Sequence, residues 1–149
     1  MKNKIKYEEN VKNVLKKDGI QNIKVDKINF SHYKTSNIEK DLDKGSWAKR
    51  LIYNETHSAV LICQKPGETN RTHFHKNDDE WWVVLSGTIK WWIEDEGEII
   101  AEQGDIIFAK RGKQHKIKTI GSQNSVRLAV SCPDIPHFHP INDSAPQNF

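Results

Sequence analysis

Cysteine is scarce in this sequence. The 149 residues include only two, Cys63 and Cys132, which lie far apart and form no C-x-x-C pair. Neither a disulfide framework nor a thiolate zinc knuckle is therefore indicated. We expect both side chains to fill strand positions, because a free cysteine behaves as a small hydrophobic residue.

Long apolar runs are also missing. Nowhere do about 18 consecutive apolar residues occur, the length that a transmembrane helix needs. The first residues, MKNKIKYEENVKNVLKKDG, contain no apolar core of the kind that a signal peptide carries. We therefore expect a cytoplasmic protein that does not associate with membranes.

The sequence has little surplus of either charge. Its 23 basic residues are nearly balanced by 20 acidic ones, which leaves a net charge of +3, and the basic side chains are concentrated in residues 1–17. This pattern gives weak support for a nucleic-acid surface, and no helix-turn-helix is evident. No phosphate-binding glycine loop or Ser-His-Asp pattern is present, so nucleophilic catalysis is not indicated. We expect a small-molecule partner and no nucleic acid.

The length fits one domain, which the local patterns divide into three parts. Residues 1–46 are expected to form a short amphipathic helix over 4–18, a candidate edge strand over 23–30 and an irregular arm over 31–46, all packing on a barrel. Residues 47–133 change to short apolar runs broken by turn residues, which is typical of a small all-β sandwich or barrel. Residues 134–149 are proline-rich and are expected to form a tail across the barrel.

Potential metal ligands are concentrated in the stretch THFHKNDDEWW, residues 72–82. An exposed polar loop before a buried strand would explain such a string, and so would a metal site. Side chains alternate between the two faces of a strand. This alternation places His73 and His75 on one face, with Arg71, and it places Glu80 and Trp82 together in the next segment.

A third histidine is expected to face the same interior. In HKIKTI, residues 115–120, the alternation puts Lys116 and Lys118 toward water and His115 inward. One buried neutral histidine is commonly satisfied by a hydrogen bond, but three with a glutamate in so small a barrel are harder to satisfy without an ion. Such a ligand set suits a first-row transition metal with open positions.

The spacing of these residues resembles the two motifs of the cupin family. The first motif is matched by Gly67, His73, His75, Glu80 and Gly87, and the second by Gly104, Gly112 and His115. Lys110 replaces the usual proline of the second motif and Thr119 its usual asparagine, and neither departure removes a ligand. The resemblance covers roughly residues 47–133.

The resemblance implies a double-stranded β-helix, or jelly roll, that binds one divalent ion through His73, His75, Glu80 and His115. We prefer iron or manganese, although nickel, zinc and copper also occur in the family. Asp78 and Asp79 do not fit the motif spacing and are interpreted as a solvated turn. The family includes dioxygenases, isomerases, lyases and non-catalytic ligand-binding proteins, so the fold alone selects no reaction.

Residues beyond the ligands can only be ranked as candidates. Trp82 and Trp91 lie on inward faces and are candidates for lining a substrate pocket, with ordinary core packing as the alternative. Arg71 shares the face of the histidines and could hold a carboxylate or phosphate by a bidentate contact, or could lie at the barrel rim. Arg127 is a second candidate pocket cation.

Two features are left after this assignment. Trp81, Val83 and Leu85 make the outer face of their strand apolar, so we expect the amino-terminal region, a second sheet or a symmetric partner to cover it. Homodimers are common in the family. His137 and His139 repeat the His-x-His spacing of His73 and His75, but no glutamate follows at the right distance, so we interpret them as part of the tail.

Two functional hypotheses follow. The first is a metal-dependent enzyme for a small anionic molecule, preferably a dioxygenase, with an isomerase or a lyase as the alternative reactions. The second is a non-catalytic, metal-containing cupin that captures a small ligand as a sensor or storage protein. We favour the enzyme.

Overall fold

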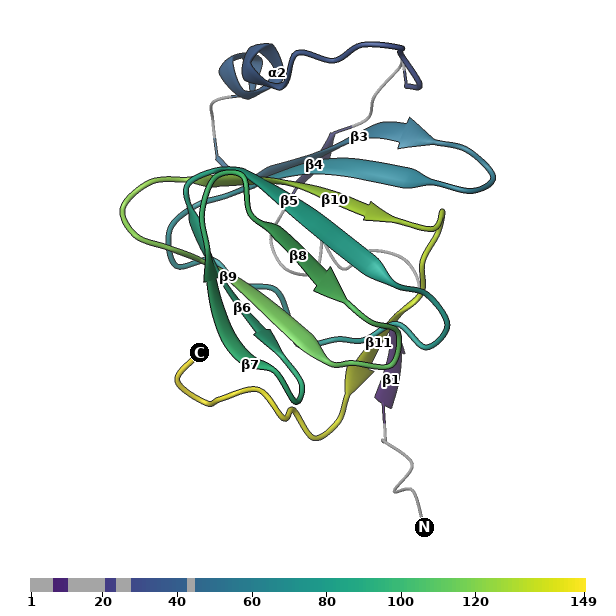
Figure 1. The fold of residues 1–149 in the computed structure, drawn as a ribbon, viewed down its shortest axis with the longest axis vertical. Helices are drawn as coiled ribbons and strands as arrows, with labels where there is room; N and C mark the ends of the chain where they lie inside the picture. Colours follow the sequence, from purple (N-terminus) through teal and green to yellow (C-terminus); the bar gives the residue numbers. More distant parts are fainter. Residues whose placement is uncertain (1–6, 11–20, 24–27, 43–44) are drawn as a thin grey trace.

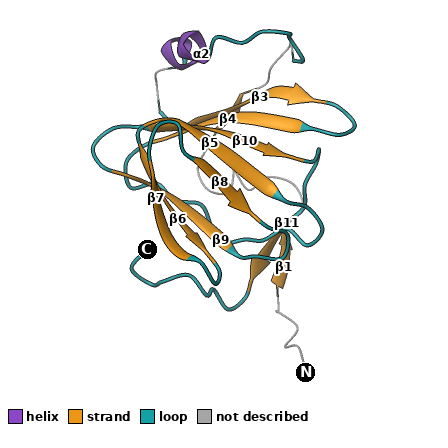
Figure 2. Cartoon of the chain, viewed as in Figure 1, coloured by secondary structure: helices purple, strands orange, loops and turns teal. Residues whose placement is uncertain are grey.

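The computed structural model describes residues 7–10, 21–23, 28–42 and 45–149 (Figure 1). Their regular secondary structure is almost entirely strand, with one short helix in the described part of the chain, α2 (Thr35–Asp41) (Figure 2). Two sheets lie face to face, as expected for a double-stranded β-helix, and the predicted fold class is confirmed.

The larger sheet has six strands in the order β2-β3-β4-β10-β5-β8. Its members are β2 (Gln21–Ile23), β3 (Trp47–Tyr53), β4 (Ser58–Gln64), β5 (Glu80–Ser86), β8 (Ile106–Ala109) and β10 (Ser125–Ser131). All neighbouring pairs in this sheet are antiparallel except β2 with β3.

The smaller sheet has three antiparallel strands in the order β7-β6-β9, namely β6 (Thr88–Ile93), β7 (Gly97–Ala101) and β9 (His115–Ile120). A separate two-stranded pairing joins β1 (Tyr7–Asn10) to β11 (His137–Pro140), so a segment from the first part of the chain lies beside one from its last part (Figure 1).

The alternation of side chains predicted from the sequence is present in both sheets. In β5, Trp82 and Val84 are fully buried, whereas Trp81 on the opposite face is exposed and Val83 is half-buried. In β9, His115 is buried and its neighbour Lys116 is not. The inward faces therefore carry both the apolar core and the polar residues of the site.

The core between the sheets is built from apolar side chains of both, including the two large rings Trp82 and Trp91. A second cluster lies on the outer face of the larger sheet, around Trp47, Leu51 and Leu61. Tyr33, Ile38, Leu42, Leu85 and Leu128 pack against this second cluster.

Gly87 shows why the first motif requires a glycine between β5 and β6. Its φ is 75°, which side chains other than glycine rarely adopt. A Cβ at this position would also lie only 2.5 Å from the carbonyl oxygen of Asn124. The close approach lets β5 turn directly into β6 while the loop before β10 passes beside it.

The amino-terminal predictions require correction. Tyr7–Asn10 lies inside the predicted 4–18 helix but forms strand β1, and the other residues of that range lie outside the described part. The pairing of β1 with β11 supplies backbone hydrogen bonds that a weak helical pattern does not outweigh. The arm predicted to be irregular contains α2. The expected edge strand exists as β2, but over Gln21–Ile23 only.

The carboxyl-terminal segment includes a strand, β11. Phe138 of β11 forms an isolated β-bridge with Phe74. Phe149 is buried and lies 4.7 Å from the ammonium of Lys90. Within the described residues, the only helix is too short to cross a membrane.

Candidate metal centre

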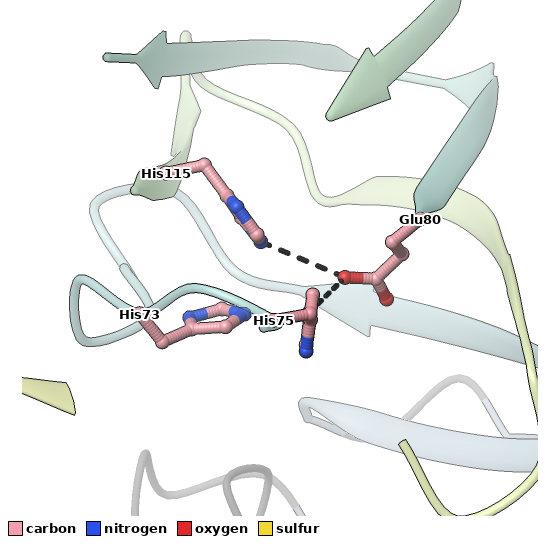
Figure 3. A group of neighbouring side chains, drawn as sticks. All are labelled: His73, His75, Glu80 and His115. Atoms are coloured by element: carbon pink, nitrogen blue, oxygen red, sulfur yellow. Dashed lines mark hydrogen bonds and ion pairs between the residues drawn. The ribbon is translucent and has the colours of Figure 1, made fainter. Parts of the chain in front are cut away.

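The structure brings the four predicted ligands together in the barrel interior. His73 and His75 lie on the segment before β5, Glu80 begins β5, and His115 begins β9. One ligand atom from each residue lies within 4.8 Å of the others, and Figure 3 shows the four side chains pointing toward one another. All four are buried, and Glu80 is the most exposed at 8%.

Backbone hydrogen bonds hold these residues in register. The amide of His73 donates to the carbonyl of His115 at 3.1 Å, and the amide of His115 donates back at 2.8 Å. The amide of Gly112 donates to the carbonyl of His75 at 2.6 Å. The two motifs, about forty residues apart in sequence, are therefore joined directly by their backbones.

The tautomer of each histidine is fixed by a backbone carbonyl. The Nδ1 atoms of His73, His75 and His115 lie 2.9, 2.8 and 3.2 Å from the carbonyl oxygens of Arg71, Pro136 and Lys113. Because a carbonyl can only accept, each Nδ1 carries the proton. In the neutral ring, Nε2 then carries the lone pair that can bind a metal, which is the arrangement that orients imidazoles on an ion.

Glu80 and the imidazoles of the centre shift one another's pKa values. The Nε2 of His75 lies 2.8 Å from a carboxylate oxygen of Glu80. Burial alone would raise the pKa of Glu80, but His115 and His75 outweigh it and hold that pKa well below its usual range. Burial would lower the pKa of His75, yet Glu80 raises it overall. Burial, reinforced by the other imidazoles, lowers the pKa of His73 well below its usual value.

One ligand atom in this centre lacks a partner. The Nε2 of His115 lies 3.6 Å from the Glu80 carboxylate, which is beyond hydrogen-bonding distance, and it is buried without a hydrogen bond. An orphaned buried acceptor is costly. A divalent cation would satisfy it, and three neutral imidazoles with one carboxylate fit such an ion. The residues present therefore fit the metal that the motif spacing implies.

His137 also reaches this centre, which the sequence did not indicate. Its ring centroid lies 4.9 Å from that of His73 and 4.7 Å from that of His75. Burial, followed by the charge of His75, lowers the pKa of His137 to about 3, so this imidazole is neutral. The ring of neighbouring His139 is 5.9 Å from that of His73, and its Nδ1 donates to the carbonyl of Thr72 at 3.0 Å. The pair belongs to the surroundings of the centre and is more than a tail.

The candidate pocket residues are placed in different environments. Trp82 and Trp91 are both core residues, with ring centroids 5.8 Å apart. The ring of Trp82 lies 5.4 Å from that of His115, so it forms a wall beside the centre. Arg127 is completely buried, with a relative exposure of 0%.

Arg71 lies at the surface, which its place in the sequence left open as an alternative to a position beside the histidines. It lines a surface depression of about 340 Å³ together with Thr69, Asn70, Thr72, Lys116, Pro140 and Asp143. None of the four candidate ligands lines this depression. Arg71 therefore lies at the surface, whereas Arg127 is buried inside the barrel.

The other polar residues of the two motifs have structural roles. Asp79 accepts hydrogen bonds from the backbone amide and the guanidinium of Arg111, which explains why it is not a ligand. Thr119, in place of the usual asparagine, is buried with its hydroxyl 2.6 Å from that of Ser125. Lys110 accepts the turn hydrogen bond from the amide of Lys113, so the turn forms without proline.

A jelly-roll barrel with three histidines and one glutamate converging inside it defines a class of β-barrels with a capacity for metal binding. Residues 60–132 match the family model described as a cupin domain. The chain belongs to the cupin family. Among curated proteins, no relative matches the sequence.

Solved structures show the same fold. A conserved protein with a double-stranded β-helix domain from Klebsiella pneumoniae is 18% identical with a TM-score of 0.63, covering 76% of this chain and 93% of that chain. The polyketide cyclase RemF from Streptomyces resistomycificus is 23% identical with a TM-score of 0.59, covering 68% and 74%. A predicted oxalate decarboxylase from Thermotoga maritima is 21% identical with a TM-score of 0.53, covering 58% and 78%. At these identities the likeness concerns the fold alone.

Proposed function

We propose that this cupin is a metal-dependent oxygenase that acts on a small organic anion, with iron or manganese as its ion. The observation that carries the proposal is the buried, unpartnered Nε2 of His115 facing Glu80, His73 and His75. Four protein ligands around an ion leave coordination positions for a substrate or dioxygen. A divalent ion held there would polarise a substrate or activate dioxygen.

The residues around the ligands support this assignment. Backbone carbonyls accept from the Nδ1 atoms of the three imidazoles, which leaves Nε2 as the atom that would bind a metal. Glu80 contributes one negative charge. A divalent ion with one carboxylate keeps a net positive charge, which favours an anionic ligand. Trp82 excludes water from one side of the centre, since it is buried and contacts His115.

Two of the structural neighbours are described as a polyketide cyclase and a predicted oxalate decarboxylase. These descriptions make an enzyme a reasonable role for the fold, but they point to different reactions. We propose a cytoplasmic enzyme with a small molecule, not a nucleic acid, as its partner. The oxygenase is preferred because the ligand set suits a redox-active ion such as iron.

The test begins with the metal. Protein purified without chelator should contain about one transition-metal ion per chain, measured by elemental analysis. The chain should then be loaded separately with Fe(II) and Mn(II), and oxygen consumption should be screened with catechol-like, thiol and organic-acid compounds. We expect oxygen uptake with one compound class and one preferred ion.

Other outcomes lead to different functions. Conversion of a compound without oxygen uptake would contradict the oxygenase and support an isomerase or lyase. Saturable binding with no conversion under either metal would support the sensor or storage role. Absence of bound metal after supplementation would overturn every metal-dependent function for this chain.

A further inference from the structure

Arg127 is an arginine enclosed within the barrel. It lies on β10, where its backbone is opposite Ile62 of β4 and Val84 of β5, and its relative exposure is 0%. Its Nη1 donates to the side-chain oxygen of Gln64 at 2.5 Å. Its Nε and Nη2 are buried and have no hydrogen-bond partner.

The orientation of this guanidinium is fixed by its neighbours. Gln64 is completely buried, and its amide nitrogen donates to the side-chain oxygen of Asn70 at 3.0 Å. This hydrogen bond directs the oxygen of Gln64 toward Arg127. One side of the guanidinium is therefore held in place while the other side, formed by Nε and Nη2, presents its N–H groups to the interior.

The two unpartnered nitrogens form the edge of arginine that suits a carboxylate. The N–H groups of Nε and Nη2 are parallel, so they can donate to both oxygens of one carboxylate. Arg111 in this same chain uses that edge, because its Nε and Nη2 lie 3.2 and 3.1 Å from the two oxygens of Asp79. Arg127 presents the same pair of donors inside the barrel without an acceptor.

Arg127 faces the same interior as the metal centre. Val84, its neighbour on β5, shares the inward face of that strand with Trp82 and Glu80. Burial lowers the pKa of Arg127 to about 10, opposed by the charge of Glu80. The guanidinium is thus positively charged at neutral pH. Trp91, also on an inward face, offers a further buried donor without a partner at its Nε1.

We propose that the Nε and Nη2 edge of Arg127 binds a carboxylate of the substrate inside the barrel, which makes the substrate an organic acid. That the bound acid is a substrate rests on the proposed function. A buried cation with unmatched donors is costly to the folded protein. A carboxylate would supply both acceptors and the missing negative charge.

A solely structural role for Arg127 makes a different prediction about stability. If the guanidinium only supported the fold, replacing it would destabilise the chain strongly. If its free edge is kept for a ligand, Arg127→Met should unfold at the same or a higher urea concentration than the wild type in the absence of carboxylates. Methionine fills a similar volume and removes the buried charge with its two unpartnered donors, which should offset the loss of the hydrogen bond to Gln64.

The binding test uses acetate and benzoate as probes, with acetamide and benzamide as neutral analogues of similar shape. Binding to the full chain is followed by NMR line broadening of the probe, both as metal-loaded protein and after removal of metal by chelator. We expect saturable binding of at least one acid and not of its amide, in both states. Arg127→Lys should weaken binding by about 10- to 100-fold and Arg127→Met should abolish it.

Arg111→Met is the matched control, because Arg111 is exposed and already occupied by Asp79. It should leave acid binding unchanged. Equal binding to the wild type and Arg127→Met, binding that disappears on removal of the metal, or no binding of either acid would overturn the carboxylate site. Metal content is measured on the same samples, so a chain that binds acids but no metal would contradict the proposed function and leave this site intact.

Discussion

His115 begins β9 and its Nε2 is buried in the candidate metal centre, so a change at this single residue has a well-defined consequence. Its Nε2 has no hydrogen bond to lose, whereas an ion would lose one of four ligands. We expect His115→Ala to lower metal affinity by at least about 100-fold, because loss of a ligand should exceed the roughly 10- to 100-fold cost of losing its supporting contact. Calorimetric titration with Mn(II) measures the change.

The control for this substitution is His57→Ala, because His57 is exposed and its Nδ1 lies 2.7 Å from the hydroxyl of Thr56, away from the four candidate ligands. It should bind Mn(II) as the wild type does. Circular dichroism should show that His115→Ala keeps its strands, since the barrel core is apolar and does not require an ion. Unchanged affinity in His115→Ala would show that the ion, if bound, lies elsewhere.

Sequence spacing and alternation were sufficient to place His73, His75, Glu80 and His115 together. These residues lie on or beside regular strands, where a period of two fixes the face. The same rule did not predict that Arg71 lies at the surface and Arg127 inside the barrel. It gives the face of a strand on which a side chain lies but not its depth in the barrel. His137 could not be predicted either, since its position depends on the return of β11 to Phe74, a contact between distant residues.

At the scale of elements, α2 is the least expected part of the fold. Its segment is polar, and the only helical signal is the spacing of Ile38 and Leu42, which lie four residues apart and so share one face. Both pack against the outer cluster of the larger sheet, with Leu85. Tyr33 adds a hydrogen bond from its hydroxyl to the carbonyl of Leu51 at 2.6 Å. Tertiary packing therefore selects this helix.

The packing of α2 makes a stability prediction. Ile38→Ala should lower the free energy of unfolding by about 1–2 kcal/mol, because Ile38 is partly buried and its loss leaves a gap against the outer cluster. Urea denaturation followed by tryptophan fluorescence measures the change. Asn37→Ala, an exposed position on the same helix, should change stability by less than about 0.5 kcal/mol. Equal effects at the two positions would mean that α2 does not stabilise the barrel.

At the scale of the whole molecule, two sheets enclose one core, and α2 covers part of the outer face of the larger sheet. The sequence predicted that Trp81, Val83 and Leu85 would need a cover. Leu85 receives it from the cluster beside α2, but Trp81 remains 39% exposed. Beside it on β8, Phe108 and Ile106 are 53% and 68% exposed. A continuous apolar surface is therefore left at one end of this sheet.

A second copy of the chain is the occupant that this surface favours. Trp81 is paired with Phe108 and Val83 with Ile106 across β5 and β8, so the four side chains form one patch. In the described part of the chain, β8 is also the last strand of its sheet, and the open edge of an antiparallel sheet can pair with the same edge of a copy. An interface about a two-fold axis uses the same patch on both subunits.

We therefore expect a homodimer that Phe108→Glu converts to a monomer, since a carboxylate opposite its own copy would be buried near a like charge. Light scattering after size-exclusion chromatography gives the mass of each variant. Ile100→Glu is the control, because Ile100 is 63% exposed on β7 of the other sheet, and it should remain dimeric. A monomeric wild type, or a Phe108→Glu variant as dimeric as the control, would show that this face stays open to solvent and that the exposed rings of Trp81 and Phe108 serve no contact between copies.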